Sequence, residues 1–316
     1  MTSPGTELAA SPVRRRAYWH AAVLLVVLLG GLYLARRHWP VLESGAGRLA
    51  GADQGWLLVG ATAALGTWAA SALAQQGAVV RRLPGSRLVA AQFAASAANH
   101  LLPAGLGAGA VNLRFLMRCG LPPGRSASAL AVKAAAGAVV RLTLIALLAP
   151  FSPGLLRLPN LSATALGLVL GGAVLLAVLL ATPLWPRCRQ ALTAVLADIR
   201  ALHACPARAA ALWGGSLAFA GLHSTVLIAV TRAVGLSLPP LQVALLYLAA
   251  SSAAALLPTP GGLGSLDAAL ALALTVSGAP GAAAASAVLG YRLLTVWLPL
   301  LPGLLVLGVL VRRKAL

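Results

Sequence analysis

The residues of this chain that could do chemistry are basic side chains placed inside long apolar stretches. Lys133 and Arg141 fall in one such stretch, and Arg292 falls in another. A cation buried this far into an apolar segment is costly unless it is paired, so its presence indicates a function. Together with Arg114, four cations face one anion, Asp267, at this depth. The imbalance predicts a bound anion, and a phosphate group suits the arginine forks best.

The spacing of the basic residues predicts which of them share a site. Lys133 and Arg141 are eight residues apart, which places them about 80° apart around a helix and about 12 Å apart along it. Both can therefore face one cavity. The alternative for each is that its long side chain extends to the membrane interface. For Arg114, which lies close to the end of its segment, that alternative is the favoured interpretation.

Asp267 has two possible roles. It is the carboxylate nearest to Arg292 in sequence at membrane depth, and we expect the two to pair. Alternatively, Ser265 is an N-cap and Asp267 is an acid in the first helical turn that stabilises the helix dipole without a role in transport. Both interpretations stay open at this point.

Asn99 lies one helical turn before Pro103. Its amide could satisfy backbone groups freed by a helix break, or contact a substrate headgroup. No catalytic residue, metal site or other cofactor is predicted. The predicted substrate-binding residues are Arg292, Arg141, Lys133, Asn99 and Asp267.

Two clusters of proline and glycine interrupt the apolar segments that carry these residues. They comprise Pro103, Gly105 and Gly107 in the first cluster, and Pro258, Pro260, Gly261, Gly262 and Gly264 in the second. Proline removes a backbone donor, glycine admits left-handed backbone, and hydrocarbon offers no water to satisfy the freed groups. The broken backbone is therefore expected to line a cavity and to form the gates of a transporter.

The elements that position these residues are predicted to be membrane-spanning helices. Of the 316 residues, 60% are hydrophobic and 9% charged, against about 25% charged in soluble domains. Apolar runs predict six full spans, at 17–36, 56–79, 126–150, 162–183, 209–231 and 282–310. The segments 88–118 and 241–277 each hold two arms too short to span, which predicts re-entrant hairpins. The fold class is thus an all-α polytopic membrane protein.

The predicted membrane domain, 17–311, divides into two halves that resemble each other in order. Three full spans separate the hairpins, so the hairpins enter from opposite sides and the repeat is inverted. Basic residues between spans fall mainly on the side of the basic tails 1–16 and 312–316, which predicts a plasma-membrane protein with both termini in the cytoplasm. The segment 186–206 has the pattern of an interfacial amphipathic helix, or equally of a solvated loop. The net charge of +19 is assigned to orientation and anionic headgroups, not to nucleic acid.

The run from Pro258 to Asp267, with 99–107 before it and Arg292 after it, resembles the flippase-like membrane domain of bacterial lysylphosphatidylglycerol synthases. The P-x-P-G-G-L-G-x-x-acid pattern is the most specific element, and the resemblance covers almost the entire chain. It implies an integral plasma-membrane protein; in the full-length synthases the domain moves aminoacylated phosphatidylglycerol to the outer leaflet. Two departures bear on the headgroup: Asp267 stands where relatives usually carry Glu, and Ala108 where the first half often has an acid.

The sequence therefore predicts a lipid translocator that is not an enzyme. Its substrate would be a phospholipid, aminoacylated or not, or a polyprenyl phosphate. A secondary transporter of a small anion shares the architecture, and a non-transporting partner of a separate lipid-modifying enzyme is a third hypothesis. A membrane-embedded transferase is poorly provided for, because the acidic residues include no close pair.

Overall fold

The computed structural model describes residues 47–101, 106–151, 200, 203–255 and 264–312, and all their regular secondary structure is helical. Four helices in these ranges are long and apolar enough to cross a membrane, namely α3 (Gln54–Gly77), α6 (Pro123–Leu148) with its 3-10 extension η2 (Ala149–Phe151), α9 (Pro206–Ala233), and the composite helix that starts at Gly281. They correspond to the predicted spans 56–79, 126–150, 209–231 and 282–310. The predicted spans 17–36 and 162–183, the tail 1–16 and most of 186–206 and 312–316 lie outside the described residues.

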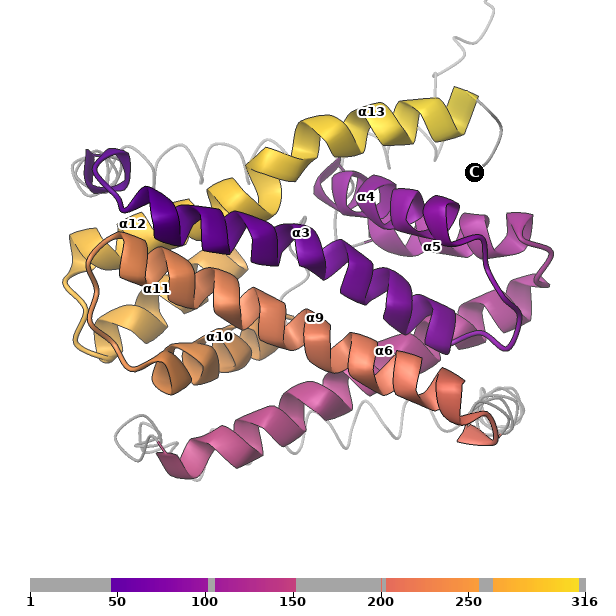
Figure 1. The fold of residues 1–316 in the computed structure, drawn as a ribbon, viewed down its shortest axis with the longest axis horizontal. Coiled ribbons are helices and arrows are strands. Elements are labelled where there is room, and N and C mark those ends of the chain that lie inside the picture. The colour runs from indigo at the N-terminus through magenta and orange to yellow at the C-terminus, as the bar shows by residue number, and fades with distance from the viewer. Residues whose placement is uncertain (1–46, 102–105, 152–199, 201–202, 256–263, 313–316) are drawn as a thin grey trace, which may run out of the picture.

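Helices α3 and α9 form an antiparallel pair through the middle of the molecule (Figure 1). The amide of Asp53, which caps the start of α3, donates to the carbonyl oxygen of Ala233 at the end of α9, at 3.0 Å. At the opposite end, a Cβ on Gly77 would clash with the backbone of Leu212. The two helices therefore pack backbone to backbone at glycine, as small residues allow in membrane proteins.

Two helical hairpins flank this pair at opposite ends (Figure 1). The first consists of α4 (Gly85–Leu101) and α5 (Leu106–Arg118), and the second of α10 (Pro240–Ala255) and α11 (Ser265–Val276). Their arms of 17, 13, 16 and 12 residues are all shorter than the roughly 20 residues that a full span needs. In each hairpin the two arms pack against each other.

In the sequence, the predicted gate residues fall between the two arms of each hairpin or at the start of the second arm. Pro103, Gly105, Pro258, Pro260, Gly261 and Gly262 lie outside the described residues. Gly107 is buried where α5 meets α4, and a Cβ there would clash with the carbonyl group of Ala98. Gly264 has a φ of +84°, a left-handed conformation that glycine adopts without strain, directly before α11.

The order and packing of the described helices fit the predicted inverted repeat. If α3 corresponds to α9, then α4, α5 and α6 correspond to α10, α11 and the last span. The corresponding helices α3 and α9 run in opposite directions. Each hairpin also packs on the span of the other half, since α4 contacts α13 (Leu298–Arg312) and α10 contacts α6.

The last span changes its helical geometry next to a predicted site residue. α12 (Gly281–Arg292) continues into a π-helical turn, η4 (Leu293–Trp297), and then into α13. The hydroxyl of Thr295 in this turn donates to the carbonyl oxygen of Tyr291 at 2.7 Å. Short π-helical turns are frequent at functional sites, and this one begins directly after Arg292.

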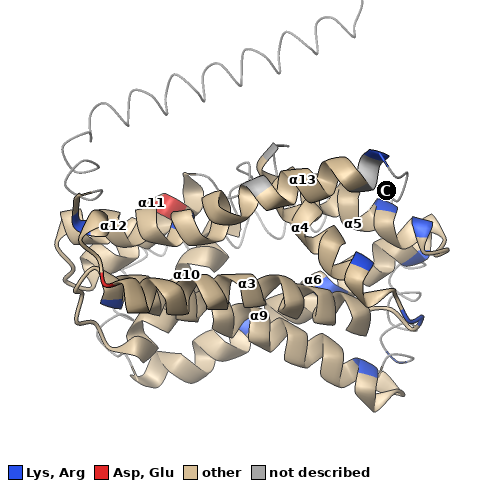
Figure 2. Ribbon diagram, turned by 45° about the horizontal axis from the view of Figure 1, so that its top comes forward, with Lys and Arg blue, Asp and Glu red and all other residues tan. Residues whose placement is uncertain are grey.

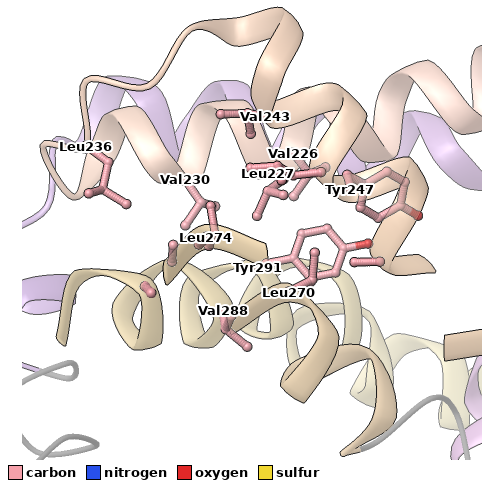
Figure 3. Packing of buried hydrophobic residues seen from close by; sticks show 14 of the residues in the cluster. Val226, Leu227, Val230, Leu236, Val243, Tyr247, Leu270, Leu274, Val288 and Tyr291 are labelled. Carbon is pink, nitrogen blue, oxygen red and sulfur yellow. The ribbon is translucent and has the colours of Figure 1, made fainter. Parts of the chain in front are cut away.

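The largest apolar cluster joins the second hairpin to α9 and α12. Figure 3 shows Val226, Leu227 and Val230 of α9 facing Leu270 and Leu274 of α11, with Tyr247 of α10 and Tyr291 of α12 at one side. Leu270 and Leu274 are fully buried. This packing fixes the two tyrosines beside the candidate site.

Candidate functional site

A cavity of about 360 Å³ lies between α3, α5, α6 and α9. Lys133 and Arg141 of α6 both line it, so the structure brings these two predicted cations together. Apart from Leu130 and Phe219, the remaining lining is small or polar, and comprises Ser71, Ala74, Gln75, Ala108, Gly109, Asn112, Ala134, Gly137, Ala138, Ser216 and Ala220. We call this space the central cavity.

Lys133 is held by neutral oxygen atoms. Its ammonium donates to the hydroxyl of Ser71 at 2.9 Å and to the amide oxygen of Gln92 at 3.2 Å. The Gln92 amide in turn donates to Asn112 at 2.8 Å, and the Asn112 amide donates to the carbonyl oxygen of Ala108 at 2.9 Å. The network orients the cation without neutralising its charge, which leaves the charge available to an anion.

Arg141 and Gln75 bring unused hydrogen-bonding groups to the cavity. The Nε of Arg141 is buried and has no hydrogen-bond partner among the described residues. Gln75 has an exposed fraction of 0%, and neither its amide nitrogen nor its amide oxygen has a partner in the same set. Buried polar groups without partners are rare and costly, so the pair indicates a ligand.

The mouth of the central cavity opens at the side of the helices. Gly109, Ala134 and Ala138, which line the cavity, are exposed. The span that contains α6 is much less buried than its neighbours. Of its apolar 18-residue stretch 6% is buried, against 44% for α3 and 50% for α9. Ala138 lies 15 residues from the start of α6, about 22 Å along its axis. The exposed lining residues of α6 therefore lie well inside the least buried of these spans.

An aromatic cluster connects the central cavity to Arg292. Phe219, at the cavity wall, packs edge to face against the ring of His223, with 4.6 Å between the ring centroids. His223 in turn stacks on Tyr247, with 5.7 Å between the centroids. The Nδ1 of His223 shares a hydrogen bond of 2.9 Å with the Tyr291 hydroxyl. Tyr291 directly precedes Arg292 at the end of α12.

Asp267 and Arg292 form an ion pair. The Oδ1 of Asp267 accepts from the Nε of Arg292, while its Oδ2 accepts from the backbone amide of Gly264 at 2.9 Å. Asp267 thus makes the predicted pair with Arg292 and is also an acid in the first turn of α11. The predicted N-cap was wrong by one residue: Gly264 is the cap and Ser265 is the first helical residue, because the left-handed Gly264 turns the chain into α11.

The other predicted site residues lie elsewhere. Asp267 and Arg292 are not among the lining residues of the central cavity, and neither is Asn99, which is half-buried on α4. Arg114 is exposed on α5, as expected for a side chain that extends to an interface.

A second cavity, of about 310 Å³, lies at the end of the molecule where α3 ends and α6 begins. Arg81 and Arg125 line it, and Arg208 donates to the carbonyl oxygens of Gln76 and Val79 nearby at 2.9 and 2.7 Å. Figure 2 shows basic residues gathered at this end, beside the end of α5. The lining residues include no acid, so this end attracts anions as well.

The sequence-based reasoning missed the neutral polar residues of the site, namely Ser71, Gln75, Gln92 and Asn112. Charged residues stand out most in an apolar segment, whereas single hydroxyls and amides do not. The signal that could have found them is weaker but present, since each has apolar residues on both sides of it in the sequence. The spacing of Ser71 and Gln75, four residues apart, places them on one helical face.

These observations define an all-helical polytopic membrane protein that has a cationic cavity in its membrane domain. The described residues include two short helical hairpins, α4–α5 and α10–α11. The chain belongs to the family described as the lysylphosphatidylglycerol synthase TM region, whose model matches residues 20–303. No curated protein matches the chain.

Proposed function

We propose that this protein moves a phosphate-bearing lipid between the two leaflets of the membrane. The observation that carries the proposal is the central cavity, where Lys133 and Arg141 meet without a lining carboxylate. An ammonium and a guanidinium bind phosphate oxygens with charge-assisted hydrogen bonds, which are about twice as strong as neutral ones. The family supports a role in lipid metabolism or translocation.

The sideways mouth of the cavity favours a lipid over a soluble anion. A lipid headgroup can enter beside α6 while its acyl chains stay in hydrocarbon. A soluble anion would need a path from the aqueous ends, whereas the exposed lining residues Gly109, Ala134 and Ala138 lie at membrane depth.

A row of cations on α6 provides a route for the headgroup. Arg125 lines the second cavity, and Lys133 and Arg141 line the central one. They follow one another at intervals of eight residues, about 12 Å along the axis. Ala129 and Leu130 are adjacent in sequence and line one cavity each. The headgroup would bind first at Arg125 and then move inward.

The same charges support the orientation that we propose. Arg81, Arg125 and Arg208 lie at one end of the helix bundle, which by the positive-inside rule is the cytoplasmic end. The first hairpin would then enter from the cytoplasm and the second from outside, in the plasma membrane. The family match is to a membrane region, which favours a role without catalysis.

Removing either cavity cation should slow lipid movement at least about tenfold, because a hydrogen bond to a charged group contributes about 1.5–3 kcal/mol. The variants are Arg141→Gln and Lys133→Gln, and Arg141→Lys should keep part of the rate because it keeps the charge. The measurement is leaflet-resolved movement of fluorescent anionic phospholipids in vesicles that contain the purified protein.

Arg114→Gln is the matched control, since this arginine is exposed and lies outside the lining of the central cavity. It should move lipid at the wild-type rate. The proposal is wrong if no lipid moves faster than in empty vesicles. Flux of inorganic phosphate in the same vesicles would then identify a small-anion transporter.

A further inference from the structure

Gln75 places an unsatisfied amide in the wall of the central cavity. Its exposed fraction is 0%, and both its nitrogen and its oxygen lack partners among the described residues. Turning the amide over, so that its oxygen and nitrogen exchange places, would leave one donor and one acceptor unpaired as before. The site thus offers one neutral donor and one neutral acceptor beside the two cations.

The acceptor is the informative half of this amide. A phosphodiester group has only acceptors to offer at neutral pH, so it can satisfy the nitrogen of Gln75, and Lys133 and Arg141, but not the oxygen. The ligand must therefore carry a donor of its own. A hydroxyl and an ammonium are the two donors that phospholipid headgroups provide.

The charges of the cavity decide between these donors. Its lining residues include no carboxylate. The acidic residues in the described ranges are Asp53, which caps α3, and Asp267, which pairs with Arg292. A headgroup with ammonium groups would bring further positive charge next to two cations in a medium of low dielectric constant. A hydroxyl donates to the Gln75 oxygen without that repulsion.

We propose that the central cavity selects an anionic phosphodiester lipid that has hydroxyl groups on its headgroup, and that Gln75 recognises these hydroxyls. The phosphate binds Lys133 and Arg141, one hydroxyl donates to the Gln75 oxygen, and a headgroup oxygen accepts from its nitrogen. The lysyl ester of the same lipid, which carries net positive charge, is disfavoured. The inference rests on the proposed lipid translocation and adds its specificity.

The test compares three labelled lipids that share their acyl chains, in vesicles containing the full chain. They are phosphatidylglycerol, which has two headgroup hydroxyls, phosphatidylmethanol, which has the same charge and none, and lysyl-phosphatidylglycerol, which is cationic. Phosphatidylglycerol should move about tenfold faster than phosphatidylmethanol, because phosphatidylmethanol leaves the buried Gln75 oxygen unpaired and an unpaired buried group lowers affinity about tenfold. It should also move faster than the lysyl lipid.

Gln75→Leu should bring the ratio between phosphatidylglycerol and phosphatidylmethanol close to one. Gln75→Glu, which adds an anion to the wall, should shift the preference toward the lysyl lipid. Gln242→Leu is the matched control, because this half-buried residue of α10 lies outside the lining of the cavity and should leave the ratio unchanged.

Two results would overturn the inference: a wild-type ratio near one, or a lysyl lipid that moves faster than its anionic parent. In either case, movement of phosphatidylmethanol above the rate in empty vesicles would leave lipid translocation itself intact. If none of the three lipids moves, the proposed function fails with the inference. Unfolding temperatures of the variants separate a lost contact from a lost fold.

Discussion

Replacing Asp267 by asparagine should lower the stability of the protein by about 3 kcal/mol. Removing one partner of a buried ion pair costs about 3–5 kcal/mol, and the lower end applies because the Asp267 side chain is 31% exposed. Arg292, a residue that is only 7% exposed, loses the carboxylate that pairs with its guanidinium. In addition, α11 loses the acid in its first turn. Thermal unfolding in a mild detergent measures the change.

A double-mutant cycle separates the stability that the Asp267–Arg292 ion pair contributes from the stability that Asp267 contributes at the start of α11. Arg292→Gln alone should also destabilise, and the double variant should be less destabilised than the sum of the two, with a coupling of about 2 kcal/mol or more. Asp53→Asn is the control, because asparagine caps a helix as well as aspartate does and Asp53 caps α3 through Trp56. A coupling near zero would show that the ion pair contributes nothing to stability.

Replacing Gly215 by valine should prevent α3 and α9 from packing. A Cβ at this position would clash with the backbone nitrogen of Ala74 and lie 2.9 Å from the carbonyl oxygen of Ala70. Backbone atoms cannot move aside as side chains can, so we expect a loss above the usual overpacking cost of about 1–3 kcal/mol. The measurement is the yield of monodisperse protein and its unfolding temperature.

The neighbouring residue provides the matched control. Gly214 also lies inside α9, but a Cβ there would meet nothing within 4 Å. Gly214→Val therefore makes the same chemical change at the outer face and should alter stability by less than about 1 kcal/mol. Equal losses for the two variants would contradict the close packing of α3 on α9.

Most of the fold could be predicted from the sequence because hydrocarbon imposes simple rules. Apolar length alone locates a span, which is why the predicted boundaries 56–79 and 209–231 lie within a few residues of α3 and α9. Proline and glycine clusters locate the breaks for a similar reason. The π-helical turn after Arg292 could not be predicted, because it depends on how α12 packs and not on local propensity.

The candidate site was only partly predictable. Charges in an apolar segment are conspicuous, so Lys133, Arg141 and Arg292 were found. Which of them share a space depends on helix packing, and the structure separates Arg292 from the lining of the central cavity. Gln75 was missed because a single amide costs far less to bury than a charge, and resembles many neutral residues of membrane helices that only satisfy backbone groups.

Because each hairpin packs on a span of the other half, the order of synthesis determines when this packing can form. α4 packs against α13, and a Cβ on Gly303 of α13 would lie 3.0 Å from the carbonyl oxygen of Phe93 in α4. About 200 residues separate these helices, so a ribosome adding about 5–20 residues per second completes α4 at least about ten seconds before its partner exists. During biogenesis the apolar face of α4 must wait in lipid or against the insertion machinery. The first half therefore reaches its final packing only when the last helix has been synthesised.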